Sequence, residues 1–246
     1  MHADKTLTMM ARPNLPDDCA MYVLHYAPDN ASMIVRLVLE AAHLPYSTRL
    51  VDRRKNDQKS ENYRKLNPTG LIPTLETPEG VMSETAAILL WLGDTHGLVP
   101  AIGDARRQIL LRWLIYTSNT PHAELRSIFY PHRYVPQETI AAHHQMGTKR
   151  MLAHFGILND VIGSEPWLAS PDGILAPYLC ALMRWSVLYP KGKTQWFTIG
   201  DFPHLLAMAV TLEGTAQARA VARAEGLGPN SFTAPTPPTP PEGAAI

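Results

Sequence analysis

The chain has 246 residues, with 22 basic and 22 acidic side chains and therefore no formal net charge. This balance gives no support to a nucleic-acid partner or an acidic membrane surface, so we expect a small-molecule partner. Apolar residues at 46% and charged residues at 18% are typical of a soluble globular protein. No apolar run is long enough to span a bilayer, so we expect a cytoplasmic protein. The 2 cysteines, far apart and without a CxxC pair, predict neither a disulfide framework nor a thiolate metal site.

The first part of the chain alternates predicted strands and helices. Residues 1–19 are expected to be a loose lead-in outside the fold. Residues 20–26, AMYVLHY, are apolar on both alternating faces, as in a strand covered on each side. After a turn, apolar positions recur at helical spacing over residues 33–41. Residues 46–52 predict a second strand, and because the intervening helix has the length of a crossover connection, we expect the two strands to be parallel.

A short helix over residues 60–66 and a β-hairpin complete this unit. The segments IPTLET and GVMS flank the tetrapeptide 77–80, Thr-Pro-Glu-Gly, whose proline at the second and glycine at the fourth position favour a tight turn. A third helix is predicted from residue 86. The order of elements in this first domain is therefore β-α-β-α-β-β-α.

Beyond residue 104 the pattern predicts helices and no strand. Apolar residues three and four apart recur over residues 105–119, 138–162, 173–189 and 203–226. We therefore predict an α/β first domain joined to an all-α second domain. The proline-rich end is expected to be extended, to have no core of its own and to lie outside the fold. The predicted boundaries are a lead-in 1–19, a first domain 20–97, a linker 98–103, a helical domain 104–228 and a tail 229–246.

Two motifs indicate a known family. The first is LNPTGLIPTLETPEGVMSETAAILLWL at residues 66–92, and the second is PWLASPDGILAPYLCALMRW at residues 166–185. In their order and spacing, the sequence resembles the cytosolic, bacterial-like glutathione transferases over residues 20–228, without indicating a class. The resemblance implies a thioredoxin-like first domain, glutathione as co-substrate without a metal, and a homodimer. The helix around Trp113 is a possible dimer surface or equally a core stripe.

The peptide bond between Ile72 and Pro73 carries the central expectation. By resemblance it is cis, and a cis bond here turns the Ile72 N–H and C=O toward a cleft, where they can pair with the cysteinyl unit of a bound peptide. The alternative is an ordinary trans proline at the start of a strand.

Glu84 and Thr85 open the next predicted helix. Unpaired N–H groups and the positive end of the helix dipole favour a carboxylate at this point, and the Thr85 hydroxyl adds a donor. The resemblance implies that this group holds the γ-glutamyl carboxylate, while Glu84 suits the ligand's ammonium group. The alternative is structural, with Ser83 as an N-cap and Glu84 as a solvated acid.

Thiolate activation requires a donor between the first strand and the first helix. In the family this position holds tyrosine, serine or cysteine, and because Ala31 occupies the place expected for cysteine, we predict a non-cysteine mechanism. The remaining candidates are Asn30, Ser32 and Tyr26. Ser32 is equally well placed to cap the helix, and Tyr26 to pack in the core.

Further candidates surround this centre. Arg54, in the basic run 53–55, is a candidate for the glycyl carboxylate of glutathione, although such a run is commonly a solvated loop. Tyr130, Arg133 and Tyr134 are predicted to form the wall of a co-substrate pocket, with core packing as the alternative. The 10 histidines show no ligand spacing with carboxylates, so we expect no zinc site.

The predicted activity is that of a glutathione transferase, in which the activated thiolate attacks a small, largely apolar electrophile. One alternative is a non-catalytic binding or scaffold protein of the same fold. The other is a glutathione-dependent isomerase, ether-cleaving enzyme or dehalogenase, which differs only in substrate.

Overall fold

The computed structural model describes residues 22–245, so the predicted lead-in and the first two residues of the predicted first strand lie outside the described residues. The first domain contains the elements that the sequence predicts, in the predicted order. They are β1 (Tyr22–Tyr26), α1 (Ser32–Ala41), β2 (Tyr46–Leu50), α2 (Glu61–Leu66), β3 (Thr74–Thr77), β4 (Gly80–Ser83) and α3 (Thr85–His96).

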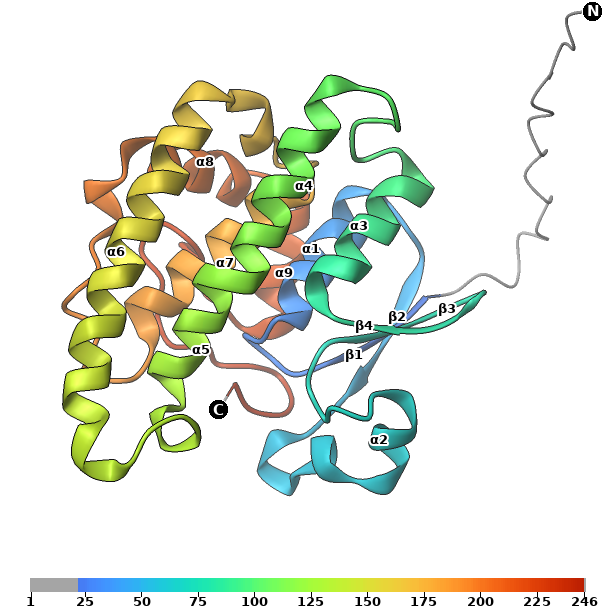
Figure 1. Cartoon of the computed structure of the whole chain (residues 1–246). Coiled ribbons are helices and arrows are strands. Elements are labelled where there is room, and N and C mark those ends of the chain that lie inside the picture. Colours follow the sequence, from blue (N-terminus) through green and yellow to red (C-terminus); the bar gives the residue numbers. More distant parts are fainter. Residues whose placement is uncertain (1–21, 246) are drawn as a thin grey trace, which may run out of the picture.

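The four strands form one mixed sheet in the order β2-β1-β3-β4. β1 and β2 are parallel, as expected from the crossover helix, with Leu24 opposite Thr48. β3 runs antiparallel to β1 and forms the predicted hairpin with β4. α1 and α3 lie on one side of the sheet, toward the second domain, and α2 lies on the other side (Figure 1). This is the thioredoxin-like arrangement.

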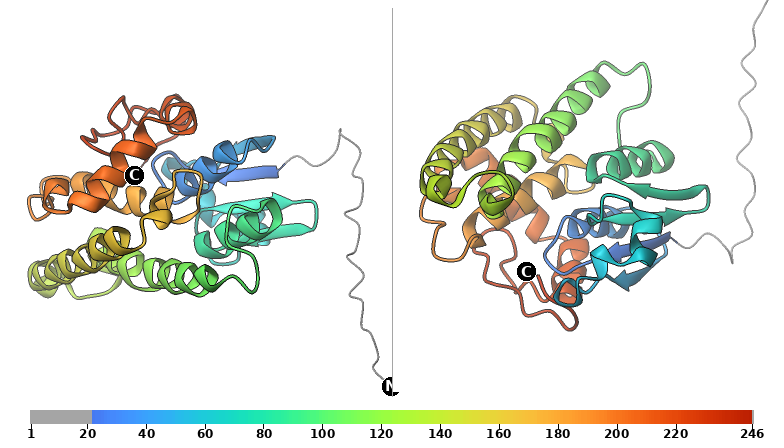
Figure 2. Two further views of the ribbon diagram at one scale, coloured as in Figure 1. Left: turned by 90° about the horizontal axis from the view of Figure 1, so that it is seen from above. Right: turned by 60° about the horizontal axis from the view of Figure 1, so that its bottom comes forward.

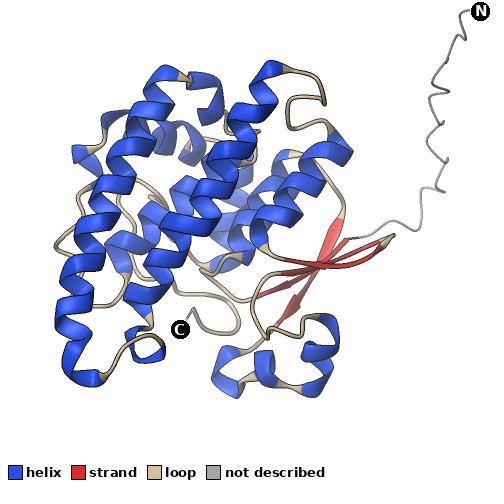
Figure 3. Cartoon of the chain, viewed as in Figure 1, coloured by secondary structure: helices blue, strands red, loops and turns tan. Residues whose placement is uncertain are grey.

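The second domain is helical throughout its described residues, and every strand of residues 22–245 lies in the first domain (Figure 3). Its helices are α4 (Ala105–Thr117), α5 (Ala123–Phe129), α6 (Ile140–Ser164), α7 (Leu175–Leu188), α8 (Pro203–Glu213) and α9 (Ala216–Glu225). A π turn, Ser118–His122, joins α4 to α5. The predicted helix over residues 203–226 is divided at Gly214, after which the Thr215 hydroxyl accepts the Ala218 N–H at 3.2 Å and caps α9.

One hydrophobic core extends through both domains. Every residue of α7 from Leu175 to Ser186 is buried, because this helix has neighbours on all sides. α1 packs against α7 and α9 as well as against its own sheet. The loop that follows β1 is therefore held by both domains. No helix within residues 22–245 is long and apolar enough to cross a membrane.

The proline-rich tail does not stay apart from the fold, contrary to our expectation. It turns back over the first domain, and its end lies beside the β1–α1 loop (Figure 2). Phe232 is buried, the Thr239 N–H donates to the Gly226 carbonyl at 2.8 Å, and Glu242 accepts a hydrogen bond from the Tyr26 hydroxyl. Gly226 has a φ of +65°, and a side chain there would collide with the Thr239 carbonyl. The tail needs no core of its own because its Phe232 packs into the single core that the two domains share.

Candidate functional site

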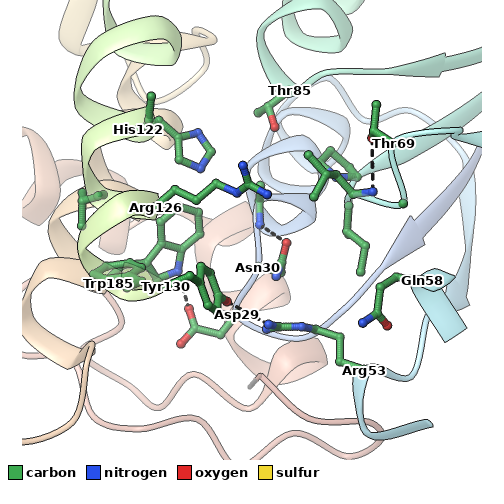
Figure 4. A pocket seen from close by; sticks show the side chains of 18 of the residues that line it. Asp29, Asn30, Arg53, Gln58, Thr69, Thr85, His122, Arg126, Tyr130 and Trp185 are labelled. Atoms are coloured by element: carbon green, nitrogen blue, oxygen red, sulfur yellow. Dashed lines mark hydrogen bonds between the residues drawn. The ribbon is translucent and has the colours of Figure 1, made fainter. Parts of the chain in front are cut away.

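A pocket of about 730 Å³ lies between the two domains, and Figure 4 shows it from close by. The first domain contributes the β1–α1 loop, the segment before β3 and the start of α3. The second domain contributes the π turn, α5 and the residues after it, and part of α7. Ala245 of the tail also lines the pocket. The site is therefore assembled from segments far apart in the sequence.

The loop before β3 presents its main chain to this pocket. The bond between Ile72 and Pro73 is cis, as the resemblance implied, and both residues line the pocket. Asn67, which is 1% exposed, holds the loop by donating from its amide to the Leu71 carbonyl at 2.8 Å and accepting the Thr69 N–H at 3.1 Å. Within residues 22–245, no hydrogen bond uses the Ile72 N–H or C=O. These two groups are available to a ligand.

Glu84 sits in an unusual backbone conformation at the start of α3. Its φ of 71° and ψ of 112° lie in a region that non-glycine residues rarely adopt, at a cost of about 1–3 kcal/mol. The Glu84 side chain makes no hydrogen bond or ion pair with residues 22–245, and it lines the pocket beside Thr85. Backbone strain of this kind is concentrated at functional sites because it orients a group for a ligand. Ser83 ends β4 and is not the N-cap of α3.

Of the three candidate thiolate donors, the structure brings only Asn30 to the pocket. The Asn30 side-chain oxygen accepts the Ala31 N–H at 2.8 Å, which fixes the amide so that its NH₂ group remains for the cavity (Figure 4). The Ser32 hydroxyl is fully buried and exchanges hydrogen bonds with the Ala27 main chain, and Ala31 is the N-cap of α1. Tyr26 is 2% exposed and bonded to the tail. Ser32 and Tyr26 therefore lie outside the pocket, and their hydroxyl groups are used in hydrogen bonds within the protein.

In the basic run, Arg53 lines the pocket and Arg54 does not. Arg54 turns back to Asp52, which accepts from both its main-chain N–H and its guanidinium. Arg53 donates to the Tyr130 hydroxyl at 2.8 Å and to the carbonyl of Ala245. Arg53, rather than the predicted Arg54, is therefore the residue of the basic run that faces the pocket, because the 3₁₀ turn after β2 directs Arg53 toward the second domain.

The second domain contributes polar and aromatic residues to this side of the pocket. Tyr130, Arg133 and Tyr134 line the pocket as expected, and so do His122 and Arg126, which the sequence did not single out. Both project from consecutive turns of one helical segment toward the first domain (Figure 4). Their helical spacing of four residues was visible in the sequence, but nothing there showed which face met the other domain.

His122 is neutral at ordinary pH. Its Nδ1 shares a hydrogen bond with the Tyr178 hydroxyl at 2.7 Å. Burial, with a smaller contribution from the charge of Arg126, lowers the pKa of His122 to about 4. The ring can therefore exchange a hydrogen bond with a ligand but carries no charge. No group of three or more His, Cys, Asp or Glu residues within residues 22–245 is arranged to hold a metal.

A buried ionic cluster positions the loop that carries Asn30. The neighbouring Asp29 is 4% exposed and accepts two bonds from Arg184, at 2.8 and 3.1 Å. It also accepts from the Trp185 indole at 2.9 Å and the Tyr189 hydroxyl at 2.8 Å. Its own N–H donates to Glu225 of α9 at 2.9 Å. Through Asp29, the second domain therefore holds the loop in place. The sequence did not reveal this structural role of Asp29.

Comparison with known proteins agrees with this geometry. Residues 31–95 match the family described as "Glutathione S-transferase, N-terminal domain". Glutathione S-transferase GST-4.5 of Xanthomonas campestris pv. campestris is 26% identical over 168 residues, which are 66% of this chain and 81% of that protein. The disulfide-bond oxidoreductase YfcG of Escherichia coli is 25% identical over 169 residues, which are 65% of this chain and 77% of that protein.

A solved structure of a glutathione transferase homologue from Sulfitobacter, with bound glutathione, superimposes with a TM-score of 0.72 at 22% identity. The alignment covers 82% of this chain and 96% of that one, so the likeness includes both domains. Residues 31–95 therefore match the N-terminal domain of the glutathione S-transferase family, and the chain as a whole is similar to glutathione transferases in sequence and in its two-domain fold.

Proposed function

We propose that this protein binds glutathione in the pocket between its domains and activates the thiol for attack on a small electrophile. The observation that carries the proposal is the Asn30 amide, which the Ala31 N–H locks at 2.8 Å with its donor end free for the pocket. A thiolate accepts a hydrogen bond far better than a thiol, so a donor fixed in advance favours the ionised form.

The residues of the first domain suit the remaining groups of the tripeptide. The free main chain of Ile72 can pair with the cysteinyl unit as an added strand does. The unpaired Glu84 carboxylate suits the ammonium group, while Thr85 and the first turn of α3 suit the γ-glutamyl carboxylate. Arg53, rather than Arg54, suits the glycyl carboxylate. Each terminal charged group of the ligand then has either an oppositely charged side chain or hydrogen-bond donors facing it.

A single donor can supply most of the activation required. Lowering the pKa of a thiol from about 8.5 to about 6.5 corresponds to about 2.7 kcal/mol of preferential thiolate stabilisation. A hydrogen bond to a charged group contributes about 1.5–3 kcal/mol. Asn30 therefore accounts for the larger part, and the nearby N-terminus of α1 favours the negative charge further.

The thiol within residues 22–245 does not support a mixed-disulfide mechanism. Within residues 22–245 the free cysteine is Cys180, which is fully buried in α7, and burial raises the pKa of its thiol. In the reaction we propose, the glutathione sulfur forms a bond to an electrophilic carbon and the leaving group departs with its electron pair.

Calorimetric titration with glutathione tests the binding step, and turnover of a chloronitrobenzene tests the chemistry. We expect binding and turnover in the native protein and retained binding with strongly reduced turnover in Asn30→Ala. Absence of heat at millimolar glutathione would refute the proposal. Binding without turnover of the chloronitrobenzene, a disulfide or a maleyl substrate would instead indicate the non-catalytic alternative.

A further inference from the structure

The pocket carries a positive charge that the whole chain does not. The chain has 22 basic and 22 acidic residues. The pocket lining, in contrast, includes six lysine or arginine residues and only two acids, Asp29 and Glu84. The charge of Asp29 is already engaged by Arg184 at 2.8 Å. A pocket with low-dielectric walls concentrates such an excess and attracts anions.

The excess is most one-sided on the second domain. Its lining residues include Arg126, Arg133 and Lys191 and no aspartate or glutamate. None of these three forms an ion pair within residues 22–245, whereas other arginines of the same domain do. Arg107 pairs with Asp94 at 2.6 Å, and Arg150 pairs with Glu124 at 2.7 Å.

Arg126 is held over the cavity by a neutral group. Its Nη1 donates to the Tyr134 hydroxyl at 3.0 Å, which directs the guanidinium without using its charge. Figure 4 shows the side chain pointing into the cavity between His122 and Asn30. Glu84 faces the same pocket from α3, but the two side chains form no ion pair. Arg133 lies over the Tyr130 ring, 4.8 Å from its centroid, at the rim.

This inference rests on the proposed function, in which Glu84, Thr85 and Arg53 bind the charged ends of glutathione. The positive charge of the second domain then has no partner on glutathione. We propose that the co-substrate is an anionic electrophile, a planar molecule with a carboxylate that Arg126 binds while the glutathione sulfur attacks it. The Tyr130 ring lines the same pocket and offers an aromatic contact for its body. Arginine suits a carboxylate because its planar fork can donate two parallel hydrogen bonds. The co-substrate is thus less apolar than the sequence led us to expect.

A matched pair of substrates tests this assignment. In para-chloro-meta-nitrobenzoate and its carboxamide, the glutathione sulfur forms a bond to the ring carbon and chloride leaves with the bonding electrons. The two differ in charge but barely in shape. We measure kcat/KM for each, divide by the uncatalysed rate with glutathione, and compare the ratio of anion to amide. We expect the native protein to favour the anion by about tenfold, which corresponds to about 1.4 kcal/mol.

Arg126→Gln should remove most of this preference, and Arg126→Lys should retain part of it. Arg112→Gln is the matched control, because it deletes one positive charge from an exposed position on the preceding helix, where Arg112 stacks on Trp113 away from the pocket. We expect the control to keep the native ratio. If Arg126 acts on the thiolate instead, Arg126→Gln slows both substrates equally and leaves the ratio unchanged, which would overturn the proposal.

A binding measurement at equilibrium keeps the test decisive if the protein turns over neither of the two aryl chloride substrates. The glutathione conjugates of the two substrates are titrated calorimetrically against the native protein and Arg126→Gln. Tighter binding of the carboxylate conjugate by the native protein, lost in the variant, supports the proposal. Equal affinities overturn it. If glutathione itself gives no heat, the proposed function fails, whereas normal glutathione binding with equal affinities for the conjugates isolates the failure to this inference.

Discussion

Replacement of Asn30 by alanine tests the chemistry most directly. The side-chain oxygen of Asn30 is bound to the Ala31 N–H, so the variant removes one oriented NH₂ donor from the pocket together with this local hydrogen bond. A hydrogen bond to a charged acceptor contributes about 1.5–3 kcal/mol. Since one pKa unit corresponds to about 1.36 kcal/mol, the pKa of the bound glutathione thiol should rise by about 1–2 units.

The assay is a pH titration of the thiolate ultraviolet absorbance of glutathione bound at saturation. If the native complex titrates near pH 6.5, the variant should titrate near pH 8, and its rate at pH 7 with any thiol-reactive electrophile should fall by about tenfold. The affinity for S-methylglutathione, which has no ionisable thiol, should change little. Asn30→Asp should raise the pKa further, because it places a negative charge beside the thiolate.

Ser32→Ala is the matched control. Among residues 22–245 its hydroxyl bonds only to the Ala27 main chain, at 3.1 and 3.3 Å, so the variant should lose stability without any change in the pKa of the bound thiol. An unchanged thiol pKa in Asn30→Ala, or an equal rise in Ser32→Ala, would refute the reasoning.

Three further predictions follow from the geometry around the pocket. Arg53→Ala should weaken glutathione binding about tenfold by calorimetry, while Arg54→Ala, whose side chain faces Asp52, should not; equal losses would place the glycyl carboxylate elsewhere. Because the pKa of His122 falls from 6.5 to about 4 on folding, only the unfolded chain gains this proton as pH drops from 7 to 5, so the free energy of unfolding decreases by up to about 2 kcal/mol. Urea unfolding at the two pH values should show a smaller decrease in His122→Gln, and an identical decrease would contradict the assignment. Asp29→Asn should lower the free energy of unfolding by about 3–5 kcal/mol because it strands a buried arginine, whereas Asp94→Asn, in a partly exposed pair, should cost less than about 1 kcal/mol.

Features encoded by short stretches of sequence were predicted correctly. The hairpin follows from the turn residues 77–80, and the cis bond at Pro73 from a motif whose members are all within a few positions of it. The parallel pairing of β1 and β2 follows from the length of the helix between them. In each case the residues that determine the structure are also neighbours in the chain.

Features set by the docking of the two domains were not predictable in the same way. His122 and Arg126 line the pocket only because their helical face meets the first domain, and the sequence does not show which face does so. The choice between Asn30 and Ser32 depends on the exact residue at which α1 begins, which sequence patterns locate poorly. The tail was misjudged because its composition predicts a lack of internal core, which is correct, but does not reveal that other parts of the protein cover it.

The return of the tail has a consequence for biosynthesis. Tyr26, in the first described strand, is tied to Glu242, and the wall of the pocket includes Ala245. The first domain can begin to form while the chain is still on the ribosome, but its surface around Tyr26 stays uncovered until residues 242–245 have emerged. The binding cavity is therefore completed only after residues 242–245 have emerged, and a chain that stops before them would lack this wall of the pocket.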